Sequence, residues 1–514
     1  MSRRALSRLA FDTGHGDADA PFDGARQLLY ACGLLPYAVR TTMSTKMLYE
    51  TVESERETLY DLAQQLWENP ELGLHEHESA EALAGTLREE GFEIEMEIGG
   101  MPTAFVATYG EADPTIGILG EYDALPGLSQ ESTAERSPIE PGGAGHGCGH
   151  NLFGTATLGA AIAVKRAIED GTLEGTIRYY GCPAEETLVG KTYMARAGVF
   201  DDLDAALTWH PGDLSTPRIG SSNALNSLVF EFSGESAHAG GSPESGRSAL
   251  DAVELTNVGV EFMREHITDN ARLHYSIPDG GDAPNVVPSE ASVWYFVRAP
   301  SREEVERNTE WLRDIAAGAA QMTQTEVEER FLSGCHDYIA NGPVTETIWE
   351  NMQEVGPIAY DEADREFARE LVETVSASNR EAELEDLPDE LRAEVESHAL
   401  YPEPVEPFNG EEVSGGSTEV GDVSYIAPTG QFTAATWPVG TPGHSWQVVA
   451  ANGDFAKKGM MFAAKVLAGT AHDLMTDAET LEAAKREFEE ATGGEPYETP
   501  LPPEAEPPFD MTAE

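Results

Sequence analysis

The stretch GHGCGHN, residues 145–151, places two imidazoles and a thiol within five residues of a glycine-rich loop. His146, Cys148 and His150 all carry side chains that coordinate zinc and related metals. A single Cys-x-His pair is a weak indication, because a buried histidine is more often a hydrogen-bonded polar group than a ligand. The loop therefore predicts a metal site only if further ligands converge on it from other parts of the chain.

Side chains of the required types follow several predicted strands. Glu185 and Glu186 stand in CPAEE, His210 in TWHPG, and His444 in the glycine–proline loop TPGHS. Together with the loop they supply thiolate, imidazole and carboxylate, the donors that zinc and its neighbours bind. This set predicts a metal centre assembled from four separate segments.

The adjacent pair Glu185–Glu186 bears on mechanism. Neighbouring side chains on an extended segment point apart, so one carboxylate can bind a metal while the other faces the substrate. A carboxylate beside a metal-bound water can take its proton, because the metal lowers the pKa of that water towards about 7. The pair indicates a metal-dependent hydrolase. The alternative for Glu185 is a plain ion pair with Lys191 or Arg196.

The surrounding pattern alternates strands and helices. It predicts strands in residues 92–98, 103–110, 115–123 and 175–181, and helices at about 55–68, 76–90, 152–168 and 191–197. Such alternation is typical of an α/β fold, here with a mainly parallel sheet flanked by helices. In such sheets ligands collect at the carboxyl ends of the strands, where the candidate residues stand.

Changes of pattern along the chain predict its organisation. Residues 223–336 form an inserted α+β unit, with a helix at about 247–266 and a strand at 291–300. Residues 47–222 and 337–470 form the main domain, in which 357–408 is an acidic insertion. Residues 1–46 are expected as an extension outside the folded unit, since translation could start at Met43 or Met47, and 471–514 as an acidic, partly disordered tail.

The charge balance is extreme, with 92 acidic against 32 basic residues, a formal charge of −60. Molar salt screens such repulsion within about 3 Å, so we expect a halophilic protein. No basic stripe exists to bind nucleic acid. Four cysteines make no disulfide framework, and no apolar run reaches a membrane span. We therefore expect a cytoplasmic protein with neither nucleic-acid nor membrane partners.

The sequence also resembles a known family through several motifs: GHGCGHNLFG, CPAEE, TWHPG, SAHAGG, APNVVPSEASVWYFVR, GSTEVGDVSY and TPGHS. In this order, across residues 47–470, they resemble the dinuclear-metal amidohydrolases and carboxypeptidases related to aminoacylase and to hippurate and auxin-conjugate hydrolases. The resemblance implies a catalytic domain with two metal ions and an inserted lid domain that forms a homodimer. It implies hydrolysis of an amide between an acyl or aroyl group and an amino acid, with p-aminobenzoyl-glutamate as first candidate.

The resemblance also implies roles for single residues. The metal ligands would be Cys148, His150, Glu186, His210 and His444, holding two divalent ions, zinc or manganese, with cobalt a further candidate. Glu185 would be the general base, and His238 a lid histidine that steadies the oxyanion in a partner's site. Asn285 and Arg298 would contact the substrate, while Asn151 and Glu121 depart from the usual pattern and keep open roles.

Three alternatives stay open at this point. The substrate could be another N-acyl amino acid or a small peptide. The chain could be an inactive metal- or ligand-binding partner of a second subunit. Cys148 could act as a nucleophile with His150 as its base.

Overall fold

The computed structural model describes residues 37–408, 410 and 413–511, with side chains from residue 45 onward. The chain divides into two units, residues 1–47 and 48–514. Of the expected extension 1–46, only the part within helix α2 (Tyr37–Ser54) is described. Cys32 lies outside the described residues.

The larger unit is built on a seven-stranded mixed sheet. Its strands, in spatial order, are β1 (Glu93–Met96), β2 (Phe105–Tyr109), β4 (Thr176–Cys182), β3 (Thr115–Glu121), β5 (Ala205–Gly212), β13 (Thr429–Ala435) and β6 (Thr216–Arg218). The four central strands run parallel, whereas β1, β2 and β6 pair antiparallel at the edges. The α/β fold is confirmed, and the sheet is parallel only in its centre.

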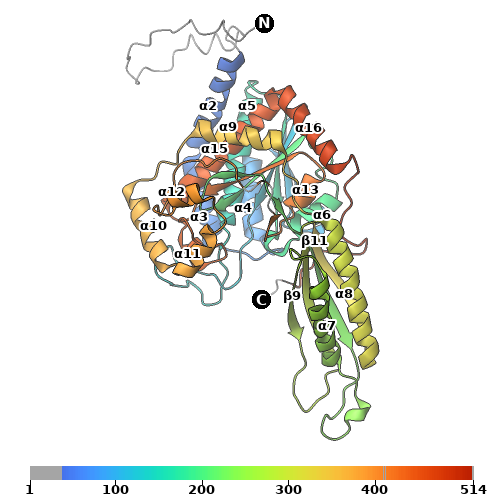
Figure 1. The fold of residues 1–514 in the computed structure, drawn as a ribbon. Helices are drawn as coiled ribbons and strands as arrows, with labels where there is room; N and C mark the ends of the chain where they lie inside the picture. The colour runs from blue at the N-terminus through green and yellow to red at the C-terminus, as the bar shows by residue number, and fades with distance from the viewer. Residues whose placement is uncertain (1–36, 409, 411–412, 512–514) are drawn as a thin grey trace. The chain divides into compact units, whose positions relative to one another are not determined.

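Helices cover both faces of this sheet (Figure 1). The helices of the larger unit beside the sheet are α3 (Arg56–Glu68), α4 (His77–Glu89), α5 (His150–Glu169), α6 (Gly190–Arg196), α9 (Gly342–Val355), α13 (Val420–Ser424), α15 (Asp454–Thr476) and α16 (Ala478–Thr492). Strand β3 is buried along its whole length, as expected for a strand covered on both faces. No helix in the described part of the chain is long and apolar enough to cross a membrane.

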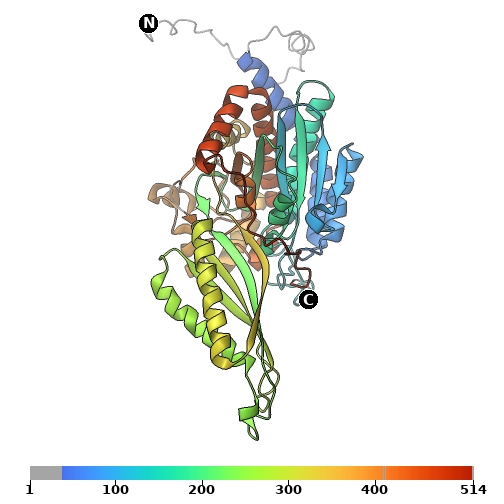
Figure 2. The same ribbon diagram turned by 90° about the vertical axis from the view of Figure 1, so that its right-hand side faces the viewer.

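A second, four-stranded antiparallel sheet, the lid sheet, lies within residues 224–335. Its order is β11 (Glu326–Cys335), β8 (Ala224–Ser233), β10 (Glu290–Ala299) and β9 (Arg272–Asp279). Helices α7 (Ala249–Met263) and α8 (Arg302–Thr323) cover one of its faces (Figure 2). Alternate residues of β10 are buried, which places every second side chain against these helices.

The acidic insertion holds three helices, α10 (Glu362–Thr374), α11 (Ala377–Leu384) and α12 (Asp389–Val395). It is anchored by apolar contacts and by ion pairs of Lys458 with Asp361 (2.9 Å) and Asp364. Leu384 and Val395 pack with Leu214 and Val439 in a small buried cluster. The insertion therefore lies against the end of β5, beside the segment that carries His210.

The end of the chain differs from the expected, partly disordered tail at 471–514. Helix α15 continues to Thr476 and α16 follows it. The next segment packs without regular structure: Tyr497 donates a hydrogen bond to Asp422 (2.7 Å), and Leu501 is 4% exposed. Proline-rich composition predicted disorder, but a few buried aromatic and aliphatic side chains suffice to fix this segment.

This packing makes a stability prediction. Leu501→Ala should lower the free energy of unfolding by about 2–5 kcal/mol, because it empties a buried site. Denaturant titration in molar salt measures the change. Ile139→Ala is the control, since Ile139 is 62% exposed and its truncation should cost little. If both substitutions lowered the free energy of unfolding by the same small amount, the claim that Leu501 is packed in a buried site would be wrong.

Candidate metal centre

The structure brings the five predicted ligands to one edge of the central sheet. His210 stands near the end of β5, Glu186 follows β4, and His444 lies in the loop after β13. Cys148 Sγ lies 3.3 Å from His210 Nε2, and His444 Nε2 lies 3.3 Å from Glu186 Oε2. The carboxyl ends of the parallel strands thus collect ligands that are up to 296 residues apart in the sequence.

A glycine sets the geometry of the loop that carries two of these ligands. Gly149 has φ of 76°, and a Cβ there would lie 2.9 Å from Pro211 Cβ. Only glycine adopts this backbone cheaply, and it lets the loop lie directly against β5. Cys148 and His150, on either side of Gly149, are thereby held next to His210.

The ligand atoms form three overlapping groups, each with all atoms within 4.8 Å of one another. The groups are Cys148–His150–His210, Cys148–Glu186–His444 and Glu121–His150–Glu185. The first two contain every predicted ligand and share Cys148. Glu186 Oε1 and His150 Nε2 are buried and have no hydrogen-bond partner among the described residues, which is costly unless a cation binds them. The donor set therefore fits a pair of divalent metal ions.

Asp123 orients these ligands, a role that the sequence analysis missed. Its Oδ1 lies 2.8 Å from His150 Nδ1, and its Oδ2 accepts a hydrogen bond from the Glu186 backbone (2.9 Å). Burial opposes ionisation, but the neighbouring imidazole outweighs it and holds the pKa of Asp123 below its usual value. The contact leaves His150 Nε2 as the metal-binding nitrogen. The signal in the sequence was an aspartate just beyond a fully buried strand.

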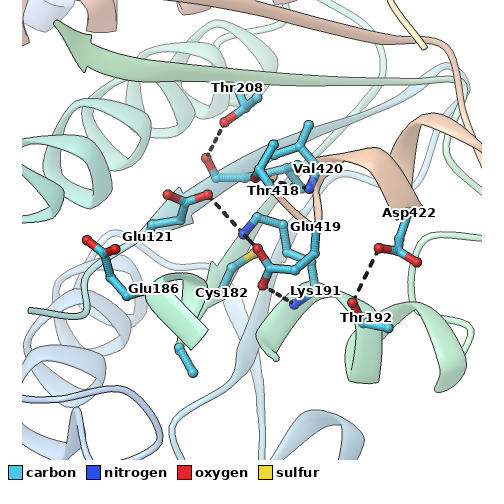
Figure 3. A network of polar contacts seen from close by, with 12 residues as sticks. Glu121, Cys182, Glu186, Lys191, Thr192, Thr208, Thr418, Glu419, Val420 and Asp422 are labelled. Atoms are coloured by element: carbon cyan, nitrogen blue, oxygen red, sulfur yellow. Dashed lines mark hydrogen bonds and ion pairs between the residues drawn. The ribbon is translucent and has the colours of Figure 1, made fainter. Parts of the chain in front are cut away.

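A buried lysine lies between two carboxylates beside this centre (Figure 3). Lys191 Nζ is 2.9 Å from Glu121 Oε1 and 3.0 Å from Glu419 Oε2. The side chains of Lys191 and Glu419 are fully buried and that of Glu121 is 2% exposed. Glu121 Oε2, in turn, lies 3.3 Å from His150 Nε2. Glu121, whose role the sequence left open, thus joins the lysine to the metal ligands.

Glu185 is left uncommitted by this network. The alternative from the sequence was an ion pair of Glu185 with Lys191 or Arg196. Lys191 instead pairs with Glu121 and Glu419. Arg196 donates to the Ala505 carbonyl (2.8 Å). Within the described residues Glu185 has no ion pair. Burial and the charges of Glu121 and Glu419 raise its pKa well above the usual range. A nearby divalent cation would reverse that shift and leave an ionised carboxylate.

The thiol of Cys148 does not have the properties of a nucleophile. Burial raises its pKa, and the charge of Glu186 adds to that effect. A nucleophilic cysteine needs the opposite, a lowered pKa and solvent access. Cys148 belongs to two of the three groups of ligand atoms, which favours a metal ligand over the alternative in which His150 acts as base to Cys148.

Two other residues of the loop have structural contacts. Asn151 donates to the Ala63 carbonyl and to Asn452, which anchors the first turn of α5. His146 is buried, with Nε2 3.1 Å from the Leu66 carbonyl oxygen. The open role of Asn151 is thereby explained by packing between helices.

His238 and Asn285 are not brought to the metal ligands within this chain. His238 is exposed in the loop after β8, where its Nδ1 accepts from the Gly240 backbone (3.1 Å). Asn285 lies beside it, its carbonyl accepting from Ala239 (3.0 Å). Strand β8 spans roughly 30 Å, and it begins at Ala224, only a short connection after β6 of the central sheet. These two side chains therefore cannot reach their own metal centre in this conformation.

Arg298 stands at the opposite end of the lid sheet, level with Leu225 of β8 and Arg272 of β9. Its Nη1 donates to the Gly415 carbonyl at 3.4 Å, and its Nε is buried without a partner in the part of the chain that the structure describes. Gly415 and His210 line the same cavity of about 960 Å³. Of the three predicted lid residues, Arg298 alone lies next to this cavity.

The buried lysine makes a prediction. Lys191→Met should lower the free energy of unfolding by about 3–5 kcal/mol, because Glu121 and Glu419 lose the cation between them. Lys465→Met is the matched control: it removes an ammonium from a partly exposed pair with Glu53, worth at most about 1 kcal/mol. Denaturant unfolding of both variants measures the difference, and equal losses would contradict this account of Lys191.

Comparison with known proteins agrees with this geometry. The chain is 40% identical over 471 residues to one of the subunits of p-aminobenzoyl-glutamate hydrolase from Escherichia coli K12, covering 89% of this chain and 97% of that protein. It is 30% identical to human Xaa-Arg dipeptidase, covering 60% of this chain and 70% of the relative.

A solved structure shares the fold. The dinuclear metal-binding M20 peptidase of Bacillus subtilis superposes with a TM-score of 0.52 at 19% identity, over 82% of this chain and 99% of that one. The family model described as peptidase family M20/M25/M40 matches residues 117–504. The chain belongs to peptidase family M20/M25/M40.

Proposed function

We propose that this protein is a metal-dependent amidohydrolase that cleaves the amide between an acyl or aroyl group and an amino acid. The observation that carries the proposal is the convergence of five metal-ligand side chains beside an unpaired, buried Glu185. p-Aminobenzoyl-glutamate is the first candidate substrate, because the 40% identical relative is named as part of a hydrolase of that compound. Other N-acyl amino acids and small peptides are the second choice, which the dipeptidase relative supports.

The ligands would be Cys148, His150, Glu186, His210 and His444, and their mixed soft and hard donors suit zinc or manganese, with cobalt as a further candidate. When bound, such a metal pair supplies Lewis acidity and a water of lowered pKa. The chain's own contribution is to fix the ligands. Asp123 holds His150, and the Pro211 carbonyl oxygen lies 2.6 Å from His210 Nδ1.

Glu185 would move the proton. Its carboxylate belongs to the group that includes Glu121 and His150, yet it is not consumed by an ion pair. It would take a proton from the attacking water and deliver it to the leaving amine nitrogen. The presence of this base argues against the alternative of an inactive binding partner.

We further propose a homodimer in which His238 and Asn285 act in the partner's site. Three apolar side chains on the outer side of α7 are exposed: Leu255 by 37%, Val258 by 51% and Phe262 by 73%. Strand β9 is an edge strand, and exposes Tyr275 and Ile277. Such a surface is typical of a subunit interface. A second, different subunit is the alternative, because the bacterial relative is named as one subunit of its hydrolase and another relative as a different one.

The charge of −60 sets the conditions in which activity should be sought. Screening by molar salt would relieve the repulsion between surface carboxylates, so we propose a halophilic enzyme. The cysteines at 148, 182 and 335 are free and buried, which suits the reducing cytoplasm that we expect.

Glu185→Gln should retain metal but lower kcat by about 100-fold or more, because the amide cannot accept the proton. Elemental analysis and turnover of p-aminobenzoyl-glutamate in molar salt, with zinc, manganese or cobalt, measure both effects. Glu186→Gln is the matched control and should lower the metal content itself. Normal turnover by Glu185→Gln would exclude Glu185 as the base.

Action of His238 across a dimer can be tested by complementation. His238→Ala and Glu185→Gln should each be nearly inactive, with the metal content of His238→Ala unchanged. Refolding an equal mixture should restore about a quarter of wild-type activity, since half of the dimers then hold one intact site. No recovery in a mixture shown to contain heterodimers would place His238 outside the partner's site.

A further inference from the structure

The cavity beside the metal centre is lined by a cationic side chain, Arg218, to which no role has yet been assigned. The cavity, of about 960 Å³, is lined by His210 at the metal centre and by Arg218 of β6. Its volume is within the range of small-molecule sites. An acyl amino acid that places its amide at the metal ligands would extend into this space. Its carboxylate would then need a cation on one of the cavity walls.

Strand pairing places Arg218 on the same face of the central sheet as His210, and both residues line the cavity. In the central sheet, Thr433 of β13 pairs with His210 on one side and with Thr216 on the other. Residues directly opposite one another share a face of a sheet, as do residues two apart on a strand. His210, Thr216 and Arg218 therefore share one face. From strand spacing and rise, the α-carbons of His210 and Arg218 lie roughly 12 Å apart.

Arg218 also lacks a partner among the described residues: its guanidinium makes no ion pair and no hydrogen bond there. Elsewhere in this acidic chain arginines pair readily, as Arg178 does with Asp202 and Arg330 with Asp510. Burial lowers the pKa of Arg218, and the charges of Tyr338 and Glu185 only partly offset it. A partly buried guanidinium without a counter-ion is costly, and a bound carboxylate would remove that cost.

The other cavity residues leave Arg218 as the free cation. The guanidinium of Arg272, which also lines the cavity, is hydrogen-bonded to the carbonyls of Asp269 and Ala271. Three acidic residues also line the cavity, Asp213, Glu383 and Asp386, and none of them forms an ion pair with Arg218. Their charges would repel an anionic substrate group and favour its placement at Arg218.

We propose that Arg218 binds a carboxylate of the substrate's amino-acid part, from within the same chain as the metal ligands. This assignment rests on the proposed function. It adds a contact on the central sheet to those of Arg298 and the partner's lid residues, so a dicarboxylic amino acid such as glutamate would meet two cations. Guanidinium and carboxylate fit each other through two parallel hydrogen bonds.

The test compares Arg218→Met with wild type on p-aminobenzoyl-glutamate and on its two mono-carboxamides. On the dicarboxylate, kcat/KM should fall by about 100-fold, the effect of losing a charge-assisted contact in a desolvated site. One of the carboxamides should be hydrolysed equally by both proteins, because it lacks the group that Arg218 contacts. Arg178→Met, which removes a guanidinium from β4, should behave as wild type.

The metal content of Arg218→Met should match wild type, and its free energy of unfolding without substrate should be no lower, because the substitution removes a partly buried guanidinium that has no counter-ion. Equal loss on all three substrates would show that Arg218 acts on structure or on the scissile amide, and no loss would show that it contacts nothing; either result overturns the proposal.

Binding separates this proposal from the proposed function. If the wild-type protein hydrolyses none of the substrates, the proposed function fails, and calorimetry with p-aminobenzoyl-glutamate then decides the role of Arg218. Affinity weakened at least tenfold by Arg218→Met would support the assignment, and unchanged affinity or no binding by either protein would overturn it.

Discussion

Repulsion among buried carboxylates is the constraint on which this structure depends. Glu121, Glu185, Glu186 and Glu419 gather at the ends of the central strands, where water cannot screen them. Burial first, and then neighbouring carboxylates, raise the pKa of most of these groups; that of Glu186 reaches about 7. Cations must therefore be supplied. Lys191 of the chain itself lies between two of these carboxylates, and metal ions at the candidate ligands would supply further positive charge.

The fold meets this constraint by separating the two kinds of cation. Lys191 lies on α6 with Glu121 and Glu419 on either side, while one of the candidate metal ligands, His210, lines the cavity. Glu121 lies between Lys191 and the metal ligands, with one carboxylate oxygen near Lys191 and the other near His150. Glu185 lies in the same group of ligand atoms but forms no ion pair with any residue that the structure describes. In the function proposed above, Glu185 would carry protons while its neighbours hold charge in place.

The sequence predicted the features of the structure that depend on local residue patterns and on motifs. Helices at 76–90 and 152–168 agree with α4 and α5 to within two residues, since buried positions recur at helical spacing there. The five ligands could be named because GHGCGHN, CPAEE, TWHPG and TPGHS occur in the order that carries the family resemblance. What could not be predicted depends on pairing across the fold: the antiparallel edges, the orienting contact of Asp123, and the ion pair of Lys191 with Glu419, which is 228 residues away. Nor does composition show that Leu501 is buried.

The terminal segment has a consequence for how the site forms during synthesis. Helix α6 begins four residues after Glu186, and its outer surface is covered by the residues around 505: Tyr193 donates to the Glu506 carbonyl (2.8 Å) and Arg196 to that of Ala505. The carboxylate pair is therefore supported by residues that follow it by more than 300 positions in the chain. A nascent chain should form a rigid site only after these residues have been synthesised and have packed against α6.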